Sequence, residues 1–185
     1  MRALLSLIIL VAGLGSAAAE SIDIGPAVGA AIPKPFVVHD PAGAVSNFDD
    51  LTGPKGAVLV FVRSAAWCPY CIVQLRDMQA ITEPLRLKGY SLVSISYDAG
   101  DVLSAFAAKY NVTYKMMSDK GSAMIDAFGI RDPQYKEGSR AYGVPKPAIY
   151  IVDKSGVVRA KLAEEGYKIR PPAEAIVAAV DALAK

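Results

Sequence analysis

Two cysteines lie three residues apart in the segment Trp67-Cys68-Pro69-Tyr70-Cys71, and they are the only cysteines in the chain. An apolar run over residues 57–62 precedes them, and apolar residues at helical spacing follow. The pattern predicts a buried strand, a short loop and a helix whose first turn carries both thiols. Two thiols so placed are able to form and open a disulfide, so the segment predicts thiol–disulfide redox chemistry.

The start of the predicted helix assigns a different role to each cysteine. Pro69 suits the first helical position, where its missing N–H is not needed, so Cys68 is predicted at or near the N-cap. There its sulfur receives backbone N–H groups and the positive end of the helix dipole, which lowers the pKa of the thiol. Cys71 lies one turn further in and is expected to be more buried. Cys68 is therefore predicted to attack, and Cys71 to resolve the mixed disulfide.

Three other interpretations of the cysteine pair stay open. A structural zinc site needs about four protein ligands, whereas the chain offers two cysteines and one histidine, His39. A purely structural disulfide closes a very short loop here, so its entropic contribution is small. A buried, inert pair is the third. The position of the pair at a helix start favours redox chemistry over all three.

The elements around the cysteines predict an α/β protein with a mixed sheet. A short hairpin is expected over residues 36–48, and a turn at 53–56 leads into the strand at 57–62. Pro84 is expected to kink or end the helix that begins near Pro69. The remaining expected elements are strands at 90–97, 115–117, 148–152 and 157–162, helices at 101–110 and 122–128, a long loop at 130–146 and a last helix after Pro171-Pro172.

The N-terminus has the composition of a secretory signal peptide. One positive charge, Arg2, precedes an apolar stretch over residues 3–14, and the small residues Ala17 and Ala19 form a cleavage site. The stretch is shorter than the roughly 20 residues that span a bilayer, so no stable membrane anchor is expected after cleavage. The predicted domains are a signal peptide at 1–19, an arm or linker at 20–34 and one domain at 35–185. A periplasmic or secreted protein is expected, in a compartment where disulfides persist.

The strand, Trp-Cys-Pro-x-Cys and helix together resemble the thioredoxin superfamily. Over roughly residues 33–185 the chain is more similar to its redoxin branch, the alkyl hydroperoxide reductase/thiol-specific antioxidant relatives. The segments that carry this resemblance are Pro35-Phe36, the hairpin, Val60-Phe61-Val62-Arg63, Ala66 to Cys71, and Pro147 to Gly156. The resemblance implies a three-layer sandwich with a central mixed sheet flanked by helices. It also implies that Pro147, placed where such folds have a cis-proline, lines the substrate groove and keeps metals from the thiols.

Other residues beside the motif are candidates for the groove. Trp67, Pro69 and Tyr70 flank the thiols, although Trp67 suits a cover for the strand end equally well. Arg63 either lowers the pKa of Cys68 by its charge or is a solvated residue at the strand end.

Three positions depart from related patterns. The common peroxiredoxins have a threonine three residues before the reactive cysteine and an arginine near the later strand, where this chain has Ala65 and Pro147. Those two residues bind and polarise the peroxide, so their absence weakens a peroxidase interpretation. Many membrane-facing thiol–disulfide oxidoreductases have a glutamate three residues after the second cysteine, where this chain has Gln74.

The sequence therefore predicts a secreted or periplasmic thiol–disulfide oxidoreductase whose partners are protein or small-molecule thiols and disulfides. The alternative is a peroxiredoxin-like thiol peroxidase, and a copper-binding redox chaperone is a third interpretation. No organic cofactor and no metal are expected. The formal charge of +2 gives no basic field for nucleic acid. The direction of exchange, the physiological partner and the oligomeric state stay open. Whether peroxide is a substrate and whether the bond before Pro147 is cis also stay open.

Overall fold

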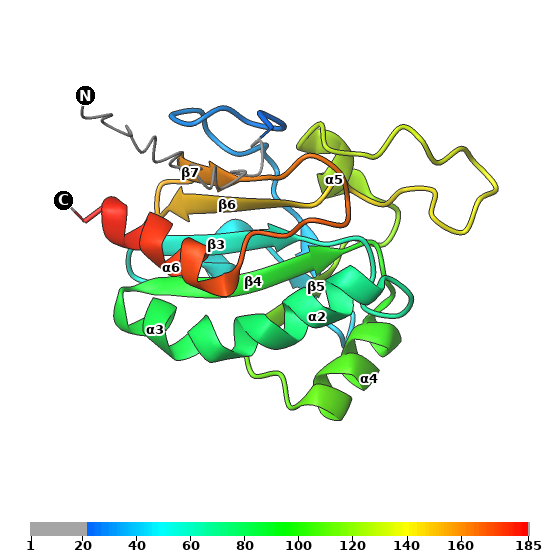
Figure 1. The fold of residues 1–185 in the computed structure, drawn as a ribbon, viewed down its shortest axis with the longest axis horizontal. Coiled ribbons are helices and arrows are strands. Elements are labelled where there is room, and N and C mark those ends of the chain that lie inside the picture. The colour runs from blue at the N-terminus through cyan, green and yellow to red at the C-terminus, as the bar shows by residue number, and fades with distance from the viewer. Residues whose placement is uncertain (1–21, 185) are drawn as a thin grey trace, which may run out of the picture.

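The centre of the protein is a seven-stranded mixed sheet that the computed structural model places within residues 22–184, the part of the chain it describes (Figure 1). The strand order is β2-β1-β5-β4-β3-β6-β7. Parallel pairs join β3 to β4 and β4 to β5, and the other neighbours are antiparallel. The strands are β1 (Val38–His39), β2 (Val45–Ser46), β3 (Gly56–Phe61), β4 (Tyr90–Ser96), β5 (Lys115–Ser118), β6 (Ala148–Asp153) and β7 (Val158–Leu162).

Alternation along the central strands divides the core into two layers. Leu59 and Phe61 of β3 face one layer, and Val58 and Val60 face the other. Successive side chains of a strand point to opposite faces of the sheet. A strand that is apolar throughout is therefore buried only if other elements cover both faces. Every residue of β3 is buried, which confirms the prediction of a buried central strand.

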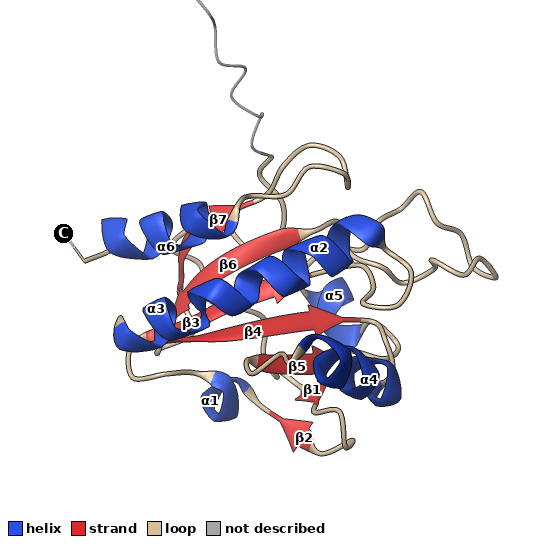
Figure 2. Ribbon diagram, turned by 60° about the horizontal axis from the view of Figure 1, so that its bottom comes forward, coloured by secondary structure: helices blue, strands red, loops and turns tan. Residues whose placement is uncertain are grey.

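Helices cover both faces of the sheet, as the three-layer prediction requires (Figure 2). The layer that holds the cysteines also takes the buried residues of α2, α3, α4 and α6, whereas those of α1 and α5 enter the other layer. The helices are α1 (Phe48–Leu51), α2 (Pro69–Asp77), α3 (Thr82–Leu87), α4 (Gly100–Tyr110), α5 (Ala123–Ala127) and α6 (Ala173–Ala182). The expected long loop lies between α5 and β6.

The helix after the cysteines breaks earlier than expected. α2 ends at Asp77, a 3₁₀ turn spans Met78–Ile81, and α3 begins at Thr82. Pro84 therefore lies in the first turn of α3, where a proline is tolerated. Within one continuous α-helix its ring would clash with the carbonyl of residue 80, so the change of geometry falls on the preceding turn.

The N-terminal part departs from the expected elements in two places. The hairpin is confirmed as β1 and β2, but Phe48 belongs to α1, a short helix capped by Asn47 that the sequence prediction missed. Residues 22–34 of the predicted arm lie along β7, and their backbone bonds include Ile22 N to Ala163 O and Ile32 N to Gly156 O. Ile32 is buried in the core. The predicted signal peptide lies outside the described residues.

Candidate active site

The cysteine pair lies where β3 ends and α2 begins. Cys68 is the N-cap of α2, with an extended backbone, and Pro69 takes the first helical position. The backbone N–H of Cys71 donates to Cys68 Sγ over 3.3 Å. This confirms the predicted placement of Cys68, in which the sulfur meets the free N–H groups and the positive end of the helix.

Cys68 and Cys71 form a disulfide across this first turn, with a Cα–Cα distance of 5.2 Å. The expected difference in burial is absent in this oxidised form, because Cys68 is 1% exposed and Cys71 is 0% exposed. The disulfide joins the N-cap to the first turn of the helix. Both cysteines are therefore covered by surrounding side chains in the oxidised protein.

Arg63 follows β3 and is enclosed by three aromatic rings. Its guanidinium carbon lies 5.3 Å from the ring centroid of Trp67, 4.8 Å from that of Tyr135 and 4.2 Å from that of Tyr167. Arg63 is 2% exposed, and its Nη2 donates to the hydroxyl of Tyr135. It is therefore a buried cation held by cation–π contacts, and the solvated strand-end interpretation is wrong. Among the described residues, its contacts are with aromatic rings and the Tyr135 hydroxyl, and its effect on the pKa of Cys68 stays a prediction.

Arg170 is the cation that reaches a sulfur atom. Its Nη2 lies 3.6 Å from Cys71 Sγ, and its Nη1 donates to the carbonyl of Ile169 over 2.8 Å. Burial, and next the nearby charge of Arg63, lower the pKa of Arg170 to about 10. Sequence reasoning missed this residue. The two contacting residues are 99 positions apart in the chain, and no local pattern connects them.

Asp98 fixes the loop that leads into the cysteines. Its carboxylate accepts from the Ser64 hydroxyl over 2.8 Å, the Ala65 backbone N–H over 2.7 Å and the Ser96 hydroxyl over 2.9 Å. Its backbone carbonyl accepts from the Ser118 hydroxyl over 2.6 Å. One buried residue therefore joins the ends of β4 and β5 to the loop before α2, and the sequence prediction missed it.

Trp67 is fixed by contacts with two other parts of the chain. Its Nε1 donates to the Tyr97 hydroxyl over 2.9 Å, and that hydroxyl donates to the carbonyl of Arg140 over 2.9 Å. Burial raises the pKa of Tyr97. Arg140 comes from the long loop before β6, and its guanidinium carbon also lies 5.6 Å from the Trp67 ring centroid. The long loop thus borders the site on the Trp67 side.

Tyr70 and Pro69 border the site on the other side. Tyr70 is 39% exposed and makes an edge contact with Tyr167, with ring centroids 6.1 Å apart. A hollow of about 320 Å³ follows α2 from Tyr70 toward α6, and Arg170 contributes to its wall. Gln74 lines the same hollow and is buried, and its Oε1 has no hydrogen-bond partner among the described residues. An exposed aromatic side chain beside the disulfide is consistent with the predicted groove.

Pro147 lies at the expected place in the sheet, directly before β6. The register of β3 and β6 pairs Phe61 with Ala148, so Pro147 comes just before the paired strand, at the end of β3 that leads to the cysteines. The cis peptide bond within residues 22–184 is Lys34–Pro35. The sequence left open whether the bond before Pro147 is cis, and in the structure this bond is trans.

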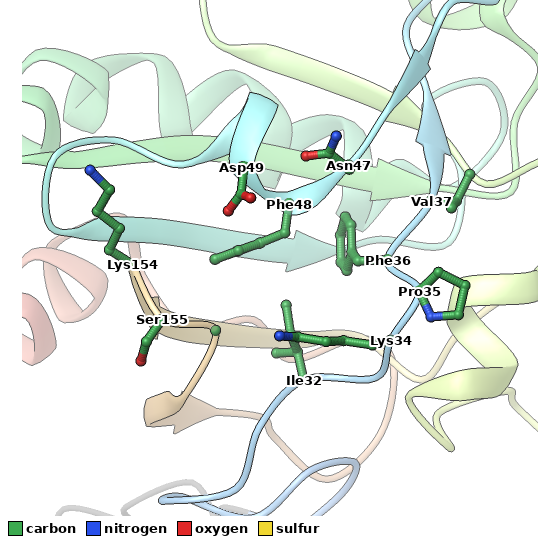
Figure 3. A pocket seen from close by; sticks show the side chains of 11 residues that line it. Ile32, Lys34, Pro35, Phe36, Val37, Asn47, Phe48, Asp49, Lys154 and Ser155 are labelled. Carbon is green, nitrogen blue, oxygen red and sulfur yellow. The ribbon is translucent and has the colours of Figure 1, made fainter.

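Another hollow of about 320 Å³ lies on the opposite face of the sheet (Figure 3). Ile32, Phe36 and Phe48 line it from the core layer that excludes the cysteines, and Lys34 and Lys154 lie at its rim. It has no sulfur and does not adjoin the disulfide, so the candidate chemistry stays at the start of α2.

Within residues 22–184, no three side chains of histidine, cysteine, aspartate or glutamate form a group able to hold a metal ion. The helices of the same range are too short or too polar to cross a bilayer.

Comparisons with known sequences converge on one family. The profile of the AhpC/TSA family matches residues 28–161. Peroxiredoxin Q of Sedum lineare is 28% identical over 127 residues, which are 69% of this chain and 64% of that relative. The thiol-disulfide oxidoreductase ResA of Bacillus thuringiensis subsp. konkukian is 26% identical over 124 residues, which are 66% of this chain and 62% of that relative. The chain thus spans less than two thirds of the length of both relatives.

Solved structures share the fold. Peroxidoxin BcpB of Mycobacterium tuberculosis superimposes with a TM-score of 0.72 at 20% identity, over 85% of this chain and 98% of that one. A thiol peroxidase of Chromobacterium violaceum gives a TM-score of 0.73 at 16% identity, over 92% and 94% of the two chains. At these identities the likeness supports the predicted thioredoxin-like architecture alone.

Proposed function

The chain belongs to the AhpC/TSA family of oxidoreductases, and from this premise we propose that it is a thiol–disulfide oxidoreductase of the periplasm or the secreted fraction. Cys68 is the attacking thiol and Cys71 the resolving thiol. The observation that carries the proposal is the disulfide across the first turn of α2, with Cys68 at the N-cap. The partners are protein or small-molecule thiols and disulfides.

The proposed exchange proceeds in two balanced steps. The Cys68 thiolate attacks a partner disulfide, a bond forms between Cys68 and one partner sulfur, and the other partner sulfur leaves as a thiolate. Cys71, deprotonated, then attacks the Cys68 sulfur, which closes the protein disulfide and releases the second partner thiolate. The partner has gained two electrons, and the protein has lost two. The reverse sequence oxidises a partner dithiol.

A thiol peroxidase is the second candidate, and the relatives named peroxiredoxins favour it. In that reaction a peroxide oxidises Cys68 to a sulfenic acid, and Cys71 displaces water to form the disulfide. The surroundings of Cys68 argue against it. Ala65 provides no hydroxyl, and its backbone N–H donates to Asp98 instead. Pro147 occupies the place of the arginine that the resemblance associates with peroxide binding.

The two candidates are separated by mixing the reduced protein with two oxidants. Trp67 is the only tryptophan and lies next to Cys68, so its fluorescence reports formation of the disulfide. We expect rapid oxidation by glutathione disulfide and a reaction with hydrogen peroxide at a rate close to that of a free thiol. Oxidation by peroxide many times faster than a free thiol would establish the peroxidase instead. Cys68→Ser is the control, because it should remove both responses.

The cellular location follows from the predicted signal peptide. We propose that residues 1–19 direct export and are removed after Ala19, and the small residues at 17 and 19 support this. Mass spectrometry of the protein purified from the native host should then give an N-terminus at Glu20. Mature protein that retains the apolar stretch over residues 3–14 would contradict the proposal.

A further inference from the structure

Arg63, which is buried, and Arg170, which is half-buried, lie near the start of α2 without acidic partners. Within residues 22–184, neither Arg63 nor Arg170 forms an ion pair with a carboxylate. The Nε atoms of both are buried and have no hydrogen-bond partner in the same range. A buried charge without a counter-charge is unfavourable, because its lost hydration is not replaced. The oxidised site therefore has an excess of positive charge that an anion would balance.

The two arginines differ in what they contact. Arg63 is enclosed by aromatic rings, whereas Arg170 extends to Cys71 Sγ. The segment before α6 fixes Arg170, because Nη1 binds the carbonyl of Ile169 and two prolines, Pro171 and Pro172, follow directly. Proline restricts the backbone on both sides of that junction. The guanidinium is thus held beside a sulfur that becomes an anion when the disulfide opens.

We propose that Arg170 is a catalytic residue that stabilises the thiolate of Cys71. A partner thiolate attacks Cys68 Sγ, a bond forms between these two sulfurs, and the Cys68–Cys71 bond breaks. Cys71 leaves with the electron pair, as a thiolate beside the Arg170 guanidinium. This inference rests on the proposed exchange reaction and adds the residue that stabilises the leaving thiolate of Cys71.

Two consequences follow for the reaction. A leaving thiol of lower pKa leaves faster, so Arg170 accelerates opening of the protein disulfide. A stabilised thiolate also favours the reduced protein, so Arg170 makes the pair a stronger oxidant than it would be otherwise. The pKa of Arg170, about 10 in the oxidised protein, still leaves the guanidinium charged at neutral pH. The guanidinium of Arg170 therefore has no counter-charge while the disulfide is closed, and it gains one, the Cys71 thiolate, when the disulfide opens.

The test isolates Cys71 in a Cys68→Ser background, in which it is the only thiol. Thiolate absorbance is titrated with pH in this variant and in the double variant with Arg170→Met. An opposite charge at this distance shifts a pKa by about one unit or more, so we expect at least a roughly tenfold weaker acid without Arg170. With both cysteines present, Arg170→Met should shift the equilibrium with glutathione about tenfold toward the protein disulfide, which corresponds to about 30 mV.

Lys168→Met is the matched control. Lys168 is an exposed cation two residues earlier in the same segment, so its loss removes one positive charge without touching the sulfur. It should leave both the Cys71 titration and the glutathione equilibrium nearly unchanged. If Arg170→Met unfolds the protein, Arg170→Gln removes the charge and keeps a hydrogen-bonding side chain for the same comparison.

Two results would overturn the inference. One is an unchanged Cys71 titration in the Arg170 variant, and the other is an equal change in Lys168→Met, which would show a general field and no specific contact. A wild-type protein that does not exchange with glutathione disulfide at all would instead contradict the proposed function itself. An active wild type with an unaffected Arg170→Met variant removes only the role of Arg170.

Discussion

Cys68→Ser is expected to abolish thiol–disulfide exchange, by a thousandfold or more, because loss of a nucleophile removes the covalent step itself. The serine hydroxyl can occupy the N-cap and accept from the N–H of Cys71, which keeps the start of α2 intact. The variant should therefore fold and show native fluorescence of Trp67 while it fails to reduce a model disulfide or to oxidise a model dithiol. Turnover with glutathione disulfide is the measurement.

Cys71→Ser is the matched variant, and it should fail at a different step. It keeps the Cys68 nucleophile, so the first attack proceeds, but no thiol resolves the mixed disulfide. We expect a covalent adduct with glutathione that is visible in the mass of the intact protein, and no such adduct in Cys68→Ser. Full turnover in Cys68→Ser, or an adduct on Cys71 alone, would reverse the assigned roles.

Asp98→Ala is expected to lower the free energy of unfolding by about 3 kcal/mol. The side chain is 7% exposed and accepts three hydrogen bonds, from Ser64, Ala65 and Ser96. Alanine leaves these donors buried without their acceptor, and each unsatisfied group costs about 1–3 kcal/mol, partly offset by water that enters the space. Urea denaturation of the oxidised protein, followed by Trp67 fluorescence, measures the loss.

Asp101→Ala is the control for this change. Asp101 is an exposed aspartate in the first turn of α4, so its removal costs only the interaction with the helix dipole, about 0.3–1 kcal/mol. Asp98→Ala should also slow exchange with glutathione disulfide, because the loop from Ser64 to Trp67 loses its attachment to β4. Equal stability of the two variants would show that Asp98 does not hold the loop.

Local sequence determined most of the elements. The apolar run at 57–62 became β3, and β4, β5, β6 and β7 appeared close to their expected ranges, because alternating or continuous apolar residues fit a sheet covered on both faces. The N-cap position of Cys68 could also be predicted, because it depends on Pro69 and on the apolar spacing that follows, which are its neighbours along the chain. The placement of the two cysteines at the start of α2 could therefore be predicted from five consecutive residues.

Short elements were harder to predict, because they depend on few residues and on their neighbours. The four-residue helix α1 owes its capping box to Asn47 and Asp50, but its buried residues Phe48 and Leu51 need the core to stabilise them. An isolated helix of that length is unstable in water. The trans bond before Pro147 is likewise set by how the long loop enters β6, which no property of a proline in the sequence reveals.

The sequence by itself determined the chemistry of this protein: two thiols at a helix start, in a chain with alternating apolar strands. Only the tertiary structure decided the electrostatic surroundings of those thiols. Asp98, Tyr135 and Arg170 reach the start of α2 from the loops that follow β4, α5 and β7. Their contacts with residues 63–71 join positions between 33 and 99 residues apart in the chain. The physical reason is that a charge or hydrogen bond acts through space at a few ångströms, whereas a sequence pattern records only neighbours along the chain.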